Sequence, residues 1–254
     1  TLFPYTTLFR SMPHPNRLQP DGTVLATPAK GAFMGNRGRL HDATGTIGPR
    51  QWQTKLWITC TLHPKPGRPP QGVTPPNGYT RLFFHDEAVA CAAGHRPCAE
   101  CRRAVYNDFR AAWARAFGHI PKAAEIDAIL HAARIDPATR RQRRHDAALA
   151  TLPDGTFILW NDQPHRIAGA HLHPFTPAGY TAPIPRPAGR TPVLTPEPLV
   201  AVLRNGWQPA LTAAQGEAQA ARDLALAYSP GVAAACMAIH AQGHTVGSVS
   251  GGCI

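Results

Sequence analysis

Lysine, acidic residues and long apolar runs are all scarce in this 254-residue chain. Its 26 basic residues are almost all arginines, and they outnumber 15 acidic residues, which gives a formal net charge of +11. No apolar stretch approaches the 20 residues that a transmembrane helix needs, and no basic-then-apolar leader opens the sequence. These absences predict a soluble, cytoplasmic protein that has no membrane partner.

Cysteine is also too sparse for a disulfide scaffold, because six cysteines are spread over the whole chain. That usage favours a reducing compartment. The sequence further lacks a glycine-rich dinucleotide fingerprint, which argues against a nicotinamide-dependent oxidoreductase. We identify no catalytic residues, and the sequence favours a non-enzymatic protein without deciding the question.

The positive charge is concentrated in the first part of the chain. Residues 1–150 hold 21 Lys and Arg against 10 Asp and Glu, whereas residues 151–254 hold 5 of each class. Guanidinium groups match phosphate bidentately, so this excess indicates DNA or RNA as a partner. An arginine-rich coding bias explains the same excess without any nucleic acid, and both interpretations stay open. The candidate phosphate-binding residues are Arg96, Arg102, Arg103, Arg140, Arg141, Arg143 and Arg144.

The chain is organised around residues 95–103 (HRPCAECRR), which contain the pair Cys98 and Cys101. This segment follows a helix-like run that ends at Gly94. Two cysteines three residues apart at a helix start can point at one atom, which is half of a zinc site. A redox dithiol normally follows a strand of a βαβ unit, and none is evident here. Two free thiols without a role are the remaining alternative.

The same region resembles a known zinc module. Residues 84–88 (FHDEA) and 92–102 (AAGHRPCAECR) are similar to the second half of the zinc-binding module of the Ada DNA-repair protein, where an Arg-Pro-Cys-x-x-Cys segment supplies two of the four ligands. Residues 35–41 (GNRGRLH) resemble the Gly-Asn strand of Ada-like modules attached to nucleases. The resemblance covers residues 30–110 and implies a zinc ion.

The resemblance also suggests the remaining ligands. Cys60 takes the place of an upstream cysteine of the Ada-like pattern, and His41 takes the place of a histidine at the end of the Gly-Asn strand. By spacing alone His63 competes with His41, because Cys60 and His63 repeat the spacing of Cys98 and Cys101. The expected metal ligands are therefore Cys60, Cys98, Cys101 and His41, with His63 as the alternative fourth ligand. Cys91 lies among alanines and is expected to be a small core residue.

Methyl transfer to the protein, the activity of Ada, is not implied here. In that family two closely spaced cysteines come first and one accepts the methyl group. In this chain a histidine would come first, and a neutral imidazole is a poor nucleophile for that reaction. A metal-dependent or cysteine-alkylating enzyme, and a zinc protein with a purely structural role, remain alternatives.

Hydrophobic periodicity predicts an α+β fold in which a small zinc-supported β-layer precedes helices and a C-terminal β-hairpin region. Residues 55–62 alternate like a strand, and residues 103–117 carry Val105, Phe109, Trp113 and Phe117 at helical spacing. Residues 12–150 are expected to hold the Ada-like module plus helices. Residues 151–210 should add a hairpin, with its turn at Asn161 and Asp162, and a proline-rich wrap (174–198) to the same domain.

Both ends of the chain look foreign. Residues 1–11 (TLFPYTTLFRS) resemble a translated sequencing adapter and are taken as an artefactual tail. Residues 222–233 are similar to a segment of bacterial malic enzymes, and residues 247–253 resemble a glycine-rich motif of XdhC-type accessory proteins. Two fragments of unrelated families in succession predict that residues 211–254 are a poorly ordered tail of a chimeric bacterial sequence.

Overall fold

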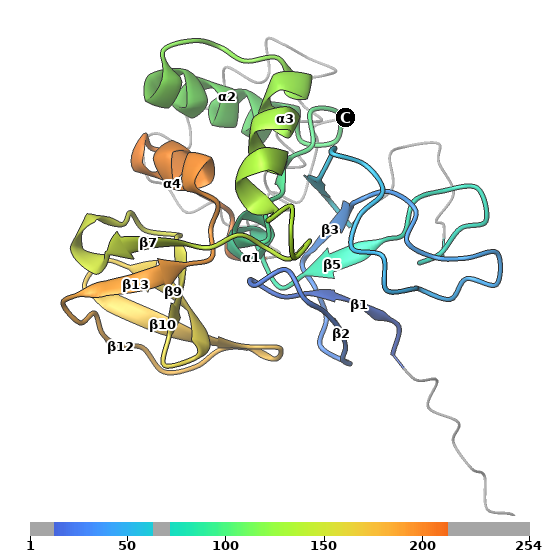
Figure 1. Cartoon of the computed structure of the whole chain (residues 1–254), viewed down its shortest axis with the longest axis horizontal. Helices are drawn as coiled ribbons and strands as arrows, with labels where there is room; N and C mark the ends of the chain where they lie inside the picture. The colour runs from blue at the N-terminus through green and yellow to red at the C-terminus, as the bar shows by residue number, and fades with distance from the viewer. Residues whose placement is uncertain (1–12, 63–71, 213–254) are drawn as a thin grey trace, which may run out of the picture.

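The computed structural model describes residues 13–62 and 72–212, which form two β-sheets and four α-helices (Figure 1). The α+β class is confirmed, and so is its order: a β-layer, then helices, then a second β-region. In the described part of the chain no helix is long and apolar enough to cross a bilayer. The predicted tails, apart from Leu211 and Thr212, and residues 63–71 of the proline-rich loop lie outside the described residues.

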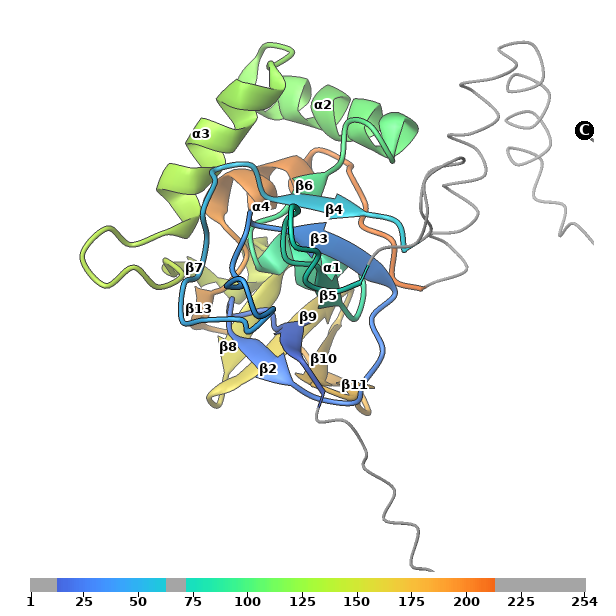
Figure 2. The ribbon, with the colours of Figure 1, turned by 90° about the vertical axis from the view of Figure 1, so that its right-hand side faces the viewer.

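The N-terminal sheet carries the cysteines. Its strands lie in the order β2-β1-β5-β3-β4-β6, with β1–β5 and β4–β6 parallel and the other neighbours antiparallel. Figure 2 shows β3, β4 and β6 side by side at one edge of this sheet. The strands are β1 (Pro15–Leu18), β2 (Val24–Ala26), β3 (Phe33–Asn36), β4 (Ile58–Cys60), β5 (Leu82–Phe84) and β6 (Arg96–Pro97).

The second sheet is antiparallel throughout and has the order β11-β10-β9-β8-β13-β7, with β12 paired to β10. Asn161 and Asp162 have φ of 49° and 58°, as a two-residue hairpin turn between β8 and β9 requires, and the predicted turn is confirmed. Its strands are β7 (His145–Ala148), β8 (Phe157–Trp160), β9 (Gln163–Ala168), β10 (His171–Thr176), β11 (Gly179–Tyr180), β12 (Ile184–Pro185) and β13 (Arg190–Val193).

Three of the helices gather at one end of the molecule (Figure 1). They are α2 (Arg103–Phe117), α3 (Ala123–Arg134) and α4 (Glu197–Arg204), and α4 packs on both of the others. On α2 the predicted stripe is buried at Val105, Phe109 and Trp113, but Phe117 at the last turn is 42% exposed. The stripe ends there because Gly118, with φ of 82°, terminates the helix.

The short helix α1 (Glu87–Ala92) lies between the two sheets, and all its residues are buried. Its small alanine and valine side chains pack in one core with residues of both sheets, including Phe84 and Phe157. Asp86 caps the helix by accepting a hydrogen bond from the Val89 amide at 2.7 Å, and accepts another from Tyr180 Oη at 2.6 Å. The two sheets therefore share one hydrophobic core across α1.

Candidate metal centre

Three cysteines from two separate segments meet at the edge of the N-terminal sheet. The sulfur atoms of Cys60, Cys98 and Cys101 all lie within 4.8 Å of one another, and none is in a disulfide. Thiolates around one tetrahedral zinc ion, with Zn–S bonds of about 2.3 Å, lie about 3.8 Å apart. Small side-chain rotations would close the group on a metal ion, so the three cysteines fit one.

Strand pairing places Cys60 beside Cys98. Thr59 pairs with Pro97 in the parallel ladder of β4 and β6, and the Cys98 amide donates to the Thr59 carbonyl at 3.0 Å. The amides of Glu100 and Cys101 both lie 3.4 Å from the Cys98 sulfur. Cys98 and Cys101 therefore occupy a tight turn that leads directly into α2, as the sequence spacing predicts.

Hydrogen bonding makes the three thiols unequal. The thiols of Cys101 and Cys60 and two backbone amides donate toward Cys98, and together they lower the pKa of the Cys98 thiol. Hydrogen bonds with the thiols of Cys101 and Cys98, followed by burial, raise the pKa of Cys60. Negative charge at this site consequently develops first on Cys98, the sulfur at the centre of the backbone turn, where it would attract a cation.

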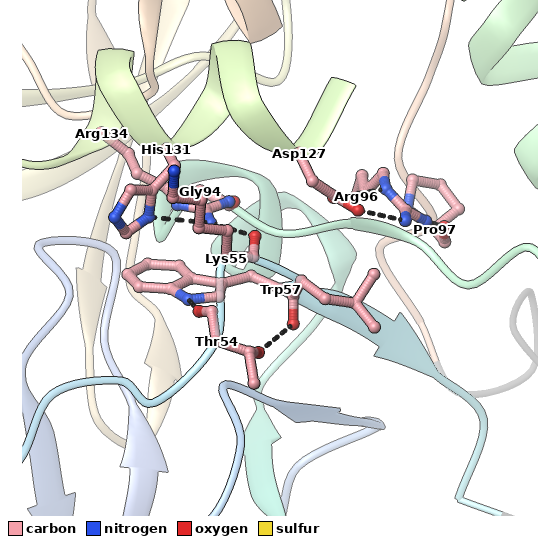
Figure 3. Close-up of polar contacts among 10 residues, drawn as sticks. Thr54, Lys55, Trp57, Gly94, Arg96, Pro97, Asp127, His131 and Arg134 are labelled. Atoms are coloured by element: carbon pink, nitrogen blue, oxygen red, sulfur yellow. Dashed lines mark hydrogen bonds and ion pairs between the residues drawn. The ribbon is translucent and has the colours of Figure 1, made fainter. Parts of the chain in front are cut away.

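A buried ion pair holds the Cys98 segment against α3. Arg96 donates from Nε and Nη2 to the two carboxylate oxygens of Asp127, each at 2.8 Å, and from Nη1 to the carbonyl of Pro97 at 3.0 Å (Figure 3). Both side chains are less than 10% exposed. Because Pro97 immediately precedes Cys98, this fork fixes the backbone that enters the cysteine turn.

A second arginine ties together the segments that precede β4 and β6. Arg134, at the end of α3, donates to the carbonyls of Gly94 and Lys55 at 2.8 and 2.6 Å (Figure 3). Lys55 precedes β4 and Gly94 precedes β6. The guanidinium carbons of Arg134 and Arg37 lie 3.8 and 3.7 Å from the Trp57 ring centroid, so the indole packs against two cations.

His95 packs beside Trp57 and the two arginines as a neutral side chain. It is 1% exposed, and its Nε2 accepts a hydrogen bond from Arg37 Nε at 3.3 Å. Burial, followed by the charges of Arg37 and Arg134, lowers the pKa of His95 well below its usual value. The buried group around Trp57 therefore contains two arginines, Arg37 and Arg134, and an uncharged imidazole, that of His95.

His41, the expected fourth ligand, does not join the cysteine group. It is buried, its Nδ1 lies 2.7 Å from Thr80 Oγ1, and its Nε2 lies 3.0 Å from the carbonyl oxygen of Pro75. Both ring nitrogens are thus engaged in holding the loop that precedes β5. The alternative ligand, His63, lies outside the described residues. Cys91 is 1% exposed and packs with α2 and α4 in the core, as expected.

The seven arginines expected to contact phosphate separate into two groups. Arg96 and Arg102 are buried, and each is held by a carboxylate, Asp127 and Glu87 respectively. Neither guanidinium is available to a phosphate at the surface, so these two leave the candidate set. The sequence could not show this, because the carboxylate partners come from other helices. The exposed members are Arg103, Arg140, Arg141, Arg143 and Arg144.

Four of these exposed arginines share one ordered loop between α3 and β7. The Arg143 amide donates to the Arg134 carbonyl at 3.0 Å, and the Asp136 amide to the Arg141 carbonyl at 2.9 Å. The Asp136 carboxylate accepts from the Ala138 and Thr139 amides at 2.9 and 2.8 Å. The only acidic side chain in the loop is therefore used by its backbone. We call residues 135–144 the arginine loop.

Comparisons with protein families, with curated proteins and with solved structures found no match for this chain. The assignment of the candidate metal centre therefore depends on the geometry of its own residues. Two contributors to it were missed in the sequence: Asp127, which anchors Arg96, and Met34, which lies opposite Cys60 in the β3–β4 ladder. No sequence pattern around either residue could have shown this, because each contacts a residue that is distant in the chain.

Proposed function

We propose that Cys60, Cys98 and Cys101 bind one zinc ion in an Ada-like module, in a reducing, cytoplasmic compartment. The observation that carries the proposal is the convergence of three thiols, within 4.8 Å, from β4 and from the turn before α2. Thiolates are the preferred ligands of structural zinc. The resemblance of residues 30–110 to the Ada module supports the same ion.

The role that we propose for this zinc is structural. The cysteines lie in a small cluster whose buried members, among the described residues, are Met34, Cys60 and Cys98. A metal ion bonded to β4 and to the start of α2 would join two segments that otherwise share few apolar contacts. Among the described residues no imidazole or carboxylate joins the thiol group, so we assign it no catalytic step.

Metal content of the full-length protein tests this proposal. We expect one zinc per chain after purification under reducing conditions, none in Cys98→Ser, and one in the control Cys91→Ser, since Cys91 lies outside the group. His63→Ala and His41→Ala identify a fourth ligand, because only the variant that removes it weakens zinc binding. Folded wild-type protein without zinc that also fails to take it up would refute the proposal.

A second function that we propose is phosphate binding by the arginine loop, with DNA or RNA as the partner. Its support is the exposure of Arg140, Arg141, Arg143 and Arg144 on one ordered loop whose single carboxylate is engaged. The Arg140 guanidinium carbon also lies 5.0 Å from the Trp52 ring centroid, so an aromatic side chain borders the loop. Arginines beside an aromatic ring suit a nucleic-acid backbone and its bases.

Fluorescence anisotropy with labelled single- and double-stranded DNA and RNA, at several salt concentrations, tests the arginine loop. Replacing its four exposed arginines by glutamine should weaken binding and reduce the slope of log K against log salt by about 0.7–0.9 per lost phosphate contact. Arg190→Gln is the matched control, because Arg190 is exposed on the second sheet. Binding that is independent of salt, or unchanged in the loop variant, would refute the arginine loop as the phosphate-binding surface, and absence of binding would leave a zinc protein with no nucleic-acid role.

A further inference from the structure

Three sulfur-bearing side chains form a row across the edge of the N-terminal sheet. Met34 on β3 is paired with Cys60 on β4, and Cys98 follows β6, the strand on the other side of β4 (Figure 2). Side chains directly opposite in an antiparallel pair project from the same face of the sheet. Met34, Cys60 and Cys98 accordingly pack together and are 9%, 4% and 5% exposed.

We propose that this cysteine site binds Cu(I) more tightly than zinc and that the Met34 thioether is its fourth ligand when it holds Cu(I). This inference rests on the proposed metal centre and concerns its ligand set and preferred ion. Thiolates bind both zinc and Cu(I), whereas a thioether is a soft donor that suits Cu(I) and is absent from the cysteine and histidine ligand sets of structural zinc. A site of three thiolates and one thioether therefore discriminates in favour of the monovalent ion.

The surroundings of the sulfur row favour a neutral fourth ligand. The side chains packed around it are Ile58, Tyr79 and Phe83, all partly buried, which makes the site mainly apolar. The thioether of Met34 is neutral, so it adds a fourth donor atom without adding negative charge to this apolar site. Phe83 is also the other ladder partner of Met34, so the methionine is held between a cysteine and an aromatic ring.

Competition with chelators of known affinity, on the reduced full-length protein without oxygen, measures Cu(I) and Zn(II) binding separately. We expect tighter Cu(I) binding in the wild type. Met34→Leu should weaken Cu(I) binding about tenfold or more, as the loss of a residue that supports a metal site typically does. It should leave zinc binding unchanged. Cys91→Ser is the control, because it removes a buried sulfur atom that lies outside the group, and it should change neither affinity.

X-ray absorption at the copper edge of the wild-type protein keeps the test independent of how well the variants fold. Four sulfur neighbours support the Met34 ligand, whereas three sulfurs with a nitrogen, or three alone, overturn it. An unchanged Cu(I) affinity in folded Met34→Leu, or zinc binding tighter than Cu(I), also overturns the inference while leaving the metal centre intact. Absence of binding by either ion would refute the metal centre itself.

Discussion

Removing the Asp127 carboxylate should destabilise the folded protein more than any surface change, because it leaves the buried Arg96 and Arg134 without their carboxylate. Asp127 is the carboxylate that pairs with the buried Arg96 guanidinium, and its charge also raises the pKa of Arg134, which burial lowers to about 9. In Asp127→Ala two buried cations would share no neighbouring anion. Both side chains of the Arg96 pair are less than 10% exposed, so water cannot replace the lost partner without opening the packing.

The magnitude follows from the burial. Breaking a buried ion pair by removing one partner typically costs about 3–5 kcal/mol. If the free energy of unfolding falls by about 2 kcal/mol for each molar increase in urea, this loss lowers the denaturation midpoint by about 2 M. Since whole domains are stable by only about 5–15 kcal/mol, this loss would be a large fraction of the total free energy of unfolding.

Urea denaturation followed by tryptophan fluorescence measures this change, because Trp57 packs directly on Arg134. The double variant Arg96→Met with Asp127→Leu removes both charges and should recover most of the loss, as apolar pairs commonly replace buried ion pairs at little cost. A midpoint shift below about 0.5 M in Asp127→Ala, or a double variant less stable than the single one, would show that the pair does not stabilise the folded protein.

Two further predictions concern the pH dependence of stability set by His95 and the packing of Gly35. The folded protein keeps His95 neutral while the unfolded chain takes up a proton below about pH 6.5, so the free energy of unfolding should fall as pH drops, by up to about 1.4 kcal/mol per pH unit. Urea midpoints at pH 7.5 and 5.5 measure this slope, and an equal slope in His95→Gln would contradict the assignment. In Gly35→Ala a Cβ would lie 2.4 Å from Phe84 Cε2 and 2.7 Å from the Ile58 carbonyl oxygen, and we expect a loss of about 1–3 kcal/mol. Gly72→Ala, where nothing lies within 4 Å, should leave the melting temperature unchanged, and equal melting temperatures for the two variants would contradict the packing argument.

The proline-rich stretch 174–198 shows where pattern reasoning fails. It was expected to wrap over a hairpin, but it contains β13, which lies inside the second sheet between β8 and β7. Pro192 within β13 has no amide proton, which normally argues against an interior strand. The strand forms nevertheless because Val193 and Leu194 are fully buried in the core, and that burial depends on residues distant in the sequence.

The sequence by itself determined the local parts of this protein: the buried stripe of α2, the hairpin at Asn161 and Asp162, and the Cys98–Cys101 turn. These depend on periodicity and spacing within a few residues. Only the tertiary structure decided which side chains meet across the sheet. It brings Met34 next to Cys60, keeps His41 in its own loop, and buries Arg96 and Arg102 against carboxylates. Strand register and helix packing set those contacts, and both follow from how the whole core is buried rather than from any local segment.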